Sequence, residues 1–131
     1  TQGSGMMGSG ARLAGMWTGL IASDDASADA WLLLEFELWL HAVRDPEIGQ
    51  IGAERFRQMR TGLAGALEDW AIEFGFHLPG PSDEVASQLI ALLTGMAFQH
   101  RLDPDAISTG AVLAGLRRLL ELTPEPARLT I

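Results

Sequence analysis

Residues 31–44 read WLLLEFELWLHAVR, and this stretch decides the class of fold. Its hydrophobic side chains would cover nearly the whole circumference of a helix, interrupted only by two glutamates, one histidine and one arginine. A helix that is apolar almost all round must be covered by other elements on most sides. We therefore predict that residues 30–44 form the central helix of an all-α domain.

Four more helices are predicted around this central helix, and local signals mark where they begin and end. Asp45 can cap the next helix, Pro46 fits its first turn, and Gly75 can terminate it. Ser82 or Asp83 would cap the helix after that. No segment alternates apolar and polar residues for long enough to predict a strand. The four helices are predicted at residues 11–22, 46–74, 83–102 and 109–122.

The composition agrees with a single folded domain. The chain has 131 residues, 47% of them hydrophobic, which suffices for one core and is too much for a disordered segment. It has no cysteine, so a disulfide framework, a thiolate metal site and a cysteine nucleophile are excluded. We expect residues 1–10 to be a linker or frayed segment, residues 11–123 the folded domain, and residues 124–131 a C-terminal tail.

Charge and hydropathy restrict the environment and the partners. No signal-like segment and no apolar run of membrane-spanning length is visible, so we expect a cytoplasmic protein without a membrane partner. The net charge is −8, and the only local basic cluster is Arg55, Arg57 and Arg60, which we interpret as a solvated helix face. Affinity for duplex DNA comes mostly from basic side chains that neutralise phosphates. This chain is therefore not expected to bind DNA by itself.

The helix predicted at residues 83–102 has two apolar faces, although a peripheral helix needs only one. One face carries Leu89 and Leu93, and the other includes Ala91 and Gly95, small residues four positions apart. Either both faces are covered within the monomer, or the second face and the last helix pair with the same elements of another chain. We predict a homodimer through a four-helix interface. Its predicted residues are Ala91, Gly95, Phe98, Leu102, Val112, Leu113, Leu116 and Leu120.

Two runs carry a resemblance to a known family. WLLLEFELWLHAVRDPEIGQIGAERFRQMR at residues 31–60 and LIALLTGMAFQHRLDPDAI at residues 89–107 resemble the C-terminal domain of TetR-family transcriptional regulators. The resemblance implies a five-helix bundle, a dimer built by the last two helices, and an effector pocket among the first four. Such regulators contact DNA through an N-terminal helix-turn-helix domain, which nothing before residue 11 could supply. DNA binding is thus expected only through that missing domain.

Other chemistries are not supported by the motifs. Glutamate and histidine occur as Glu-x-x-x-His at positions 37/41 and 73/77, whereas a di-iron bundle needs Glu-x-x-His. No helix has two histidines for a zinc-protease site, and neither a Gly-x-Ser-x-Gly elbow nor a phosphate-binding glycine loop after a strand occurs. We therefore expect no metal ion, no cofactor and no catalytic residue, and hence no enzyme.

Bulky aromatic and methionine side chains are the candidates for lining a ligand pocket. Each is most simply explained as core, but ligand pockets are lined mainly by such side chains together with a few polar groups. His41 and His100 are the polar groups that we select as candidate anchors. The predicted ligand-binding residues are Met16, Trp17, Leu20, Phe36, Trp39, Leu40, His41, Phe56, Met59, Leu63, Trp70, Leu93, Met96 and His100.

These observations lead to one functional prediction and one alternative. The prediction is that residues 11–123 bind a small apolar or amphipathic effector and form the dimer of a bacterial TetR-like regulator, a repressor. The alternative is a helical protein–protein interaction module without a small-molecule ligand, in which the apolar faces bind a different protein.

Overall fold

The computed structural model describes residues 11–17 and 26–122 of the chain. Within these residues all regular structure is helical, which confirms the predicted all-α fold. A short helical segment at residues 11–17 comes first, and four labelled helices follow. These are α2 (Ala26–Arg44), α3 (Pro46–Phe74), α4 (Ser82–Leu102) and α5 (Thr109–Leu120).

Local side-chain chemistry explains where α3 begins and ends. The Asp45 carboxylate accepts a hydrogen bond from the Glu47 N–H at 3.0 Å, which satisfies one of the free donors of the first turn. Pro46 is the first residue of the helix, and Gly75 ends it in the left-handed region with φ of 70°. These three signals were predicted and are confirmed.

The start of α4 differs from the prediction. Ser82 is the first residue of the helix, Pro81 precedes it, and no side chain caps the helix. The Ser82 hydroxyl instead donates to the Glu68 carboxylate of α3 at 2.6 Å. The predicted cap at Ser82 or Asp83 is therefore wrong, because the serine hydroxyl is used to join α4 to α3.

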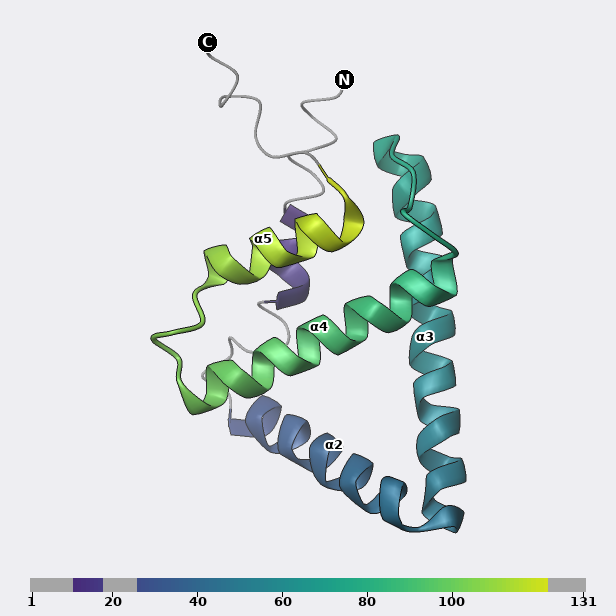
Figure 1. The fold of residues 1–131 in the computed structure, drawn as a ribbon, viewed down its shortest axis with the longest axis vertical. Helices are drawn as coiled ribbons and strands as arrows, with labels where there is room; N and C mark the ends of the chain where they lie inside the picture. Colours follow the sequence, from purple (N-terminus) through teal and green to yellow (C-terminus); the bar gives the residue numbers. More distant parts are fainter. Residues whose placement is uncertain (1–10, 18–25, 123–131) are drawn as a thin grey trace.

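The helices α2, α3 and α4 form the three sides of a triangle (Figure 1). Packing contacts join α2 to α3, α3 to α4, and α4 to α5. In Figure 1, α5 runs alongside α4 on the side away from α2, and the helical segment at residues 11–17 lies behind these two helices. α4 thus has neighbours on both sides and is the central helix.

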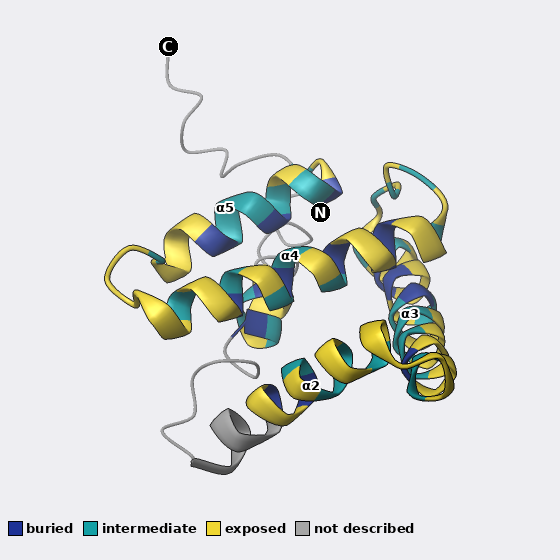
Figure 2. Ribbon diagram, turned by 60° about the horizontal axis from the view of Figure 1, so that its bottom comes forward, coloured by how far each residue is buried: buried dark blue, intermediate teal, exposed yellow. Residues whose placement is uncertain are grey.

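The core lies around α4 and α5. Buried positions run along both helices, whereas α2 is mostly exposed or half-buried in its described part (Figure 2). The core side chains come from the helical segment at residues 11–17, α2, α3, α4 and α5. They are Leu13, Trp17, Leu32, Ala64, Leu67, Trp70, Val85, Ala86, Leu89, Leu93, Ala97, Val112, Leu116 and Leu120.

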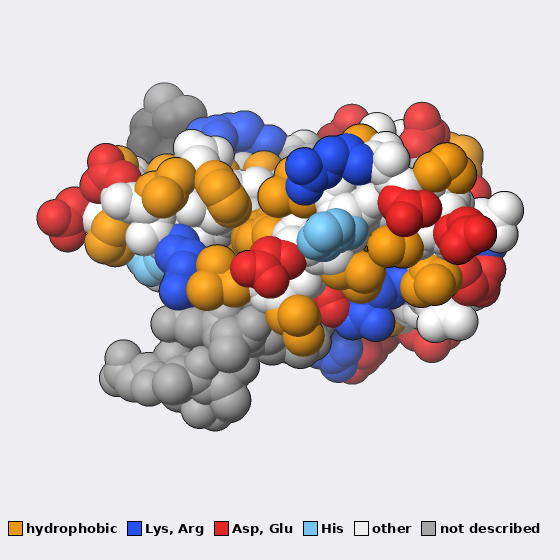
Figure 3. All heavy atoms as spheres, turned by 90° about the horizontal axis from the view of Figure 1, so that it is seen from below, with side chains coloured by type: hydrophobic (Ala, Val, Ile, Leu, Met, Phe, Trp, Pro, Cys, Tyr) orange, Lys and Arg blue, Asp and Glu red, His pale blue; other side chains and the backbone are white. Residues whose placement is uncertain are grey.

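The prediction that residues 30–44 form the central helix is wrong. Leu34 is 64% exposed and Val43 is 86% exposed, so no described element covers the outer side of α2. On the side of the molecule seen in Figure 3, hydrophobic side chains lie among acidic and basic ones. An apolar circumference shows that a helix can be buried on any side, but it does not show which sides the rest of the chain can reach.

None of the described helices, at residues 11–17 and 26–122, combines the length and the apolar composition needed to cross a bilayer.

Candidate ligand pocket

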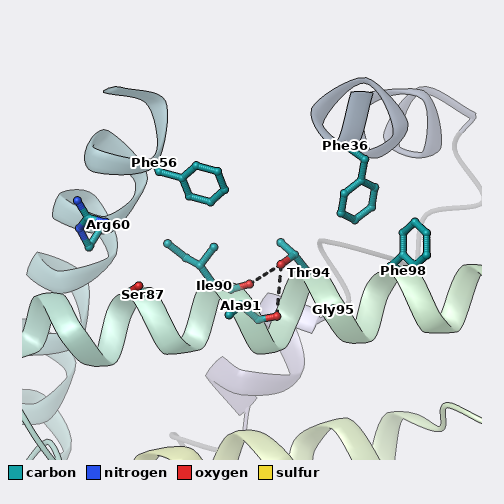
Figure 4. Close-up of a pocket in the computed structure, with 9 residues that line it drawn as sticks. All are labelled: Phe36, Phe56, Arg60, Ser87, Ile90, Ala91, Thr94, Gly95 and Phe98. Atoms are coloured by element: carbon teal, nitrogen blue, oxygen red, sulfur yellow. Dashed lines mark hydrogen bonds between the residues drawn. The ribbon is translucent and has the colours of Figure 1, made fainter. Parts of the chain in front are cut away.

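A pocket of about 580 Å³ opens inside the triangle of α2, α3 and α4. Figure 4 shows how its walls are built: α2 and α3 supply the outer walls, and one face of α4 forms the floor. The α4 positions follow helical spacing, so a single face of that helix supplies them all. The lining residues are Phe36, Phe56, Arg60, Ser87, Ile90, Ala91, Thr94, Gly95 and Phe98.

Aromatic side chains link the three helices around this pocket. The rings of Phe36 on α2 and Phe98 on α4 meet edge to face, with centroids 5.1 Å apart. Phe36 also meets Trp39 at 5.2 Å, and Trp39 meets Phe56 of α3 at 4.8 Å. Such pairs stabilise beyond the area they bury, so these rings hold α2 against both neighbours.

Few polar groups face the pocket. Among the described residues that line it, Arg60 is the only charged one, and it is half-buried. The Thr94 hydroxyl donates to the carbonyl oxygen of Ile90 at 2.8 Å, so its hydrogen is used within α4. The buried indole N–H of Trp39, next to the lining rings, finds no acceptor among the described residues. The described lining is therefore mostly apolar, with Arg60 as its charged group.

An ion pair beside the pocket joins α2 to α3. The side chain of Glu35 is only 6% exposed and accepts two hydrogen bonds from Arg55, one of them from Nε at 2.8 Å. The hydrogen bond and the negative charge of Glu35 raise the pKa of Arg55. Since Glu35 precedes Phe36 and Arg55 precedes Phe56, this pair fixes the backbone that presents two aromatic walls of the pocket.

Only two of the predicted ligand-binding residues line this pocket, namely Phe36 and Phe56. Trp39 contacts both of them from behind. Trp17, Trp70 and Leu93 are core residues, and Leu40 and His41 are exposed, so none of these five lines it. The half-buried Met16, Met59, Leu63 and Met96 are also outside the lining, and Leu20 lies outside the described residues.

His100, which was predicted as a ligand anchor, has two contacts within the fold. Its Nδ1 lies 3.1 Å from the carbonyl oxygen of Ile107, and its ring meets the edge of Trp17 with centroids 5.7 Å apart. The histidine thus stabilises the turn after α4 and packs against the core. It does not line the pocket.

The predicted dimer residues fall into two groups. Val112, Leu116 and Leu120 are buried in the core of this chain, so in this structure their side chains present no surface to a second copy. Leu113 is half-buried and packs against the same core. The amphipathic face of α5 turns inward because it is needed to cover α4 and the helical segment at residues 11–17. The remaining residues, all exposed, are Ala91, Gly95, Phe98 and Leu102.

Three of these exposed α4 residues also line the pocket, which the sequence prediction did not anticipate. Ala91, Gly95 and Phe98 share the pocket face with Ser87, Ile90 and Thr94. The sequence prediction missed Ser87, Ile90 and Thr94. These residues lie within one or two helical turns of Ala91, so helical spacing from Ala91 could have identified them as pocket residues. Arg60 was missed because the basic cluster that it forms with Arg55 and Arg57 was interpreted as a solvated helix face.

No metal centre is apparent in the described part of the chain. No three histidine, aspartate or glutamate side chains gather there closely enough to hold an ion.

The all-α fold of the described residues is consistent with a C-terminal regulator domain of the TetR type, and the match to a known family shows the class. The chain belongs to the family described as BetI-type transcriptional repressor, C-terminal, which it matches over residues 10–124. Domains of this family typically regulate transcription and do not catalyse reactions. No curated protein and no solved structure gives a significant match to the chain.

Proposed function

We propose that this chain is the effector-binding and dimerisation domain of a bacterial transcriptional repressor that acts in the cytoplasm. The pocket between α2, α3 and α4 is the observation that carries the proposal. Its volume of about 580 Å³ lies within the range of roughly 300–1,000 Å³ that small-molecule sites occupy. Its aromatic and aliphatic walls with few polar groups suit a small apolar or amphipathic effector.

The proposed mechanism is a shift between two arrangements of the triangle. The pocket touches three helices that are joined by side-chain contacts, so an effector that fills it favours one spacing of α2 and α3 over another. A ligand shifts such an equilibrium only by its difference in affinity for the two arrangements. A DNA-binding part joined to this domain would then lose or gain operator affinity by at most the ratio of the effector's affinities for the two arrangements.

The test is to fill the pocket with a side chain. Thr94 lines the pocket on α4, and Thr61 is an exposed residue of α3 outside it, so Thr94→Trp and Thr61→Trp form a matched pair. We expect the wild-type chain and Thr61→Trp to unfold at a higher temperature with a bound compound from an apolar and amphipathic panel. Thr94→Trp should lose that shift, because binding to the native state alone stabilises it.

Two outcomes would contradict this function. If Thr94→Trp is folded by circular dichroism and still responds like the wild type, the compound binds elsewhere. If the wild type responds to no compound of the panel, the alternative of a helical protein–protein interaction module is favoured.

A further inference from the structure

We propose that the pocket selects an amphipathic anion, with a carboxylate or similar acidic group at Arg60 and an apolar body against the phenylalanines. This inference rests on the proposed function because it concerns the ligand of the same pocket. It goes further by assigning the charge and the orientation of the ligand.

The first observation is the pairing of the three arginines on α3. Arg55 is paired with Glu35, and Arg57 is paired with Glu54. Arg60 has no hydrogen bond or ion pair with any residue in the described ranges, although the chain has a net charge of −8. In an acidic protein, a half-buried arginine without an acidic partner is available to a ligand.

The second observation is the charge of the lining. Among the described residues no carboxylate lines the pocket, so none of them would compensate a cationic ligand placed beside Arg60. The guanidinium is planar and offers parallel N–H donors, which match the two oxygens of a carboxylate. Because Arg60 is half-buried among apolar walls, its attraction for an anion is screened less than at an open surface.

The third observation is the separation of polar and apolar groups. In Figure 4, Arg60 and the Ser87 hydroxyl stand at one end of the pocket, and Phe36 and Phe98 stand at the other. Phe56 and Ile90 lie between the two ends. A ligand with its acidic group at Arg60 and Ser87 would place a chain or ring along Phe56 and Ile90 toward Phe36 and Phe98.

The experiment compares three probes with the same chain length and different charge. Octanoate, octan-1-ol and octyltrimethylammonium are titrated into the full chain by calorimetry, below the concentrations at which they form micelles. Wild type should bind octanoate about tenfold or more tightly than octanol, as a hydrogen-bonded charge pair warrants, and octyltrimethylammonium most weakly. Arg60→Gln should remove most of the preference for octanoate over octanol.

The control is Arg118→Gln, which removes the same charge from an exposed arginine of α5 outside the pocket. It should keep the preference of the wild type. If Arg60→Gln and Arg118→Gln behave alike, or if wild type binds the three probes equally, the assignment of an anion is overturned while the pocket itself stands. If no probe binds to the folded wild-type chain, both the anion and the proposed ligand function are overturned.

Discussion

Glu35 is buried in an unusual way for an acidic residue, because Arg55, which forms an ion pair with it, is not itself protected from water. The glutamate is 5% exposed, whereas the side chain of Arg55 that pairs with it is 41% exposed. Removing Arg55 and removing Glu35 therefore have different consequences for stability. Loss of Arg55 leaves a buried negative charge without compensation, whereas loss of Glu35 leaves a positive charge that water can reach.

We expect Arg55→Ala to lower the free energy of unfolding by about 3 kcal/mol, since breaking a buried pair leaves its other charge uncompensated. Glu35→Gln should cost only about 1 kcal/mol, because the amide stays hydrogen-bonded and Arg55 can be hydrated. Urea unfolding monitored by tryptophan fluorescence measures both values. Equal losses, or a larger loss in Glu35→Gln, would show that the buried charge does not decide the stability of this corner.

At the scale of single residues, the sequence predicted what depends on immediate neighbours. Asp45, Pro46 and Gly75 act as predicted because a cap or a stop needs only the next few residues. The place of Arg60 in the pocket lining and the contact of His100 with Ile107 were not predicted, because each depends on residues far along the chain or on a turn whose path is set by packing. A charged residue on a helix gives no signal of whether an acidic partner will reach it.

At the scale of the helices, the corner between α2 and α3 depends on close approach of the two backbones. A Cβ added at Gly52 would lie 2.8 Å from the Cβ of Ala42, and one added at Gly49 would lie 2.9 Å from the Ala42 carbonyl oxygen. Both distances are shorter than ordinary contact. The glycines, which lower the helix propensity of α3, are therefore required by the packing of α2 on its first turns.

The matched pair Gly52→Ala and Gly62→Ala tests this requirement. A Cβ at Gly62 meets nothing within 4 Å, so Gly62→Ala should stabilise the protein by up to about 1 kcal/mol through helix propensity. Gly52→Ala gains the same propensity but must push α2 away, and should destabilise by about 1–3 kcal/mol as overpacking does. Thermal and urea unfolding compare the two. If Gly52→Ala is more stable than the wild type, α2 can move away from α3 without a loss in the free energy of unfolding.

Helix periodicity predicted that α4 has two apolar faces, but it did not predict what each face contacts. The face with Leu89 and Leu93 is buried in the core, whereas the face with Ala91 and Phe98 lines the pocket. The periodicity of a sequence gives the angle between two faces of one helix. The position of each neighbouring helix depends on turns and long-range packing, which the angle does not contain.

At the scale of the whole molecule, the order and type of the helices could be predicted, and their arrangement only in part. Residues 31–44 were expected at the centre because they are apolar on all sides, yet α4 is central and the leucines of α2 are partly exposed. Because the most apolar of the four labelled helices lies at the edge, hydrophobic surface is left exposed on the single chain. The hydropathy pattern of one helix does not show whether such a surface contacts another molecule.

The predicted homodimer is the property of the whole molecule that remains to be tested, and α4 gives the means. Leu102 near its C-terminus is 74% exposed, and Ile72 on α3 is 81% exposed, so neither is needed for the core. If α4 and α5 face a second copy, Leu102→Glu places one unpaired charge from each chain in the buried interface. We expect it to weaken the dimer about a hundredfold or more.

Ile72→Glu should leave the dimer unchanged, because it adds the same charge away from the interface. Sedimentation velocity from nanomolar to micromolar concentration measures both. A wild-type chain that is monomeric at micromolar concentration would refute the dimer, and equal weakening by both variants would move the interface away from α4.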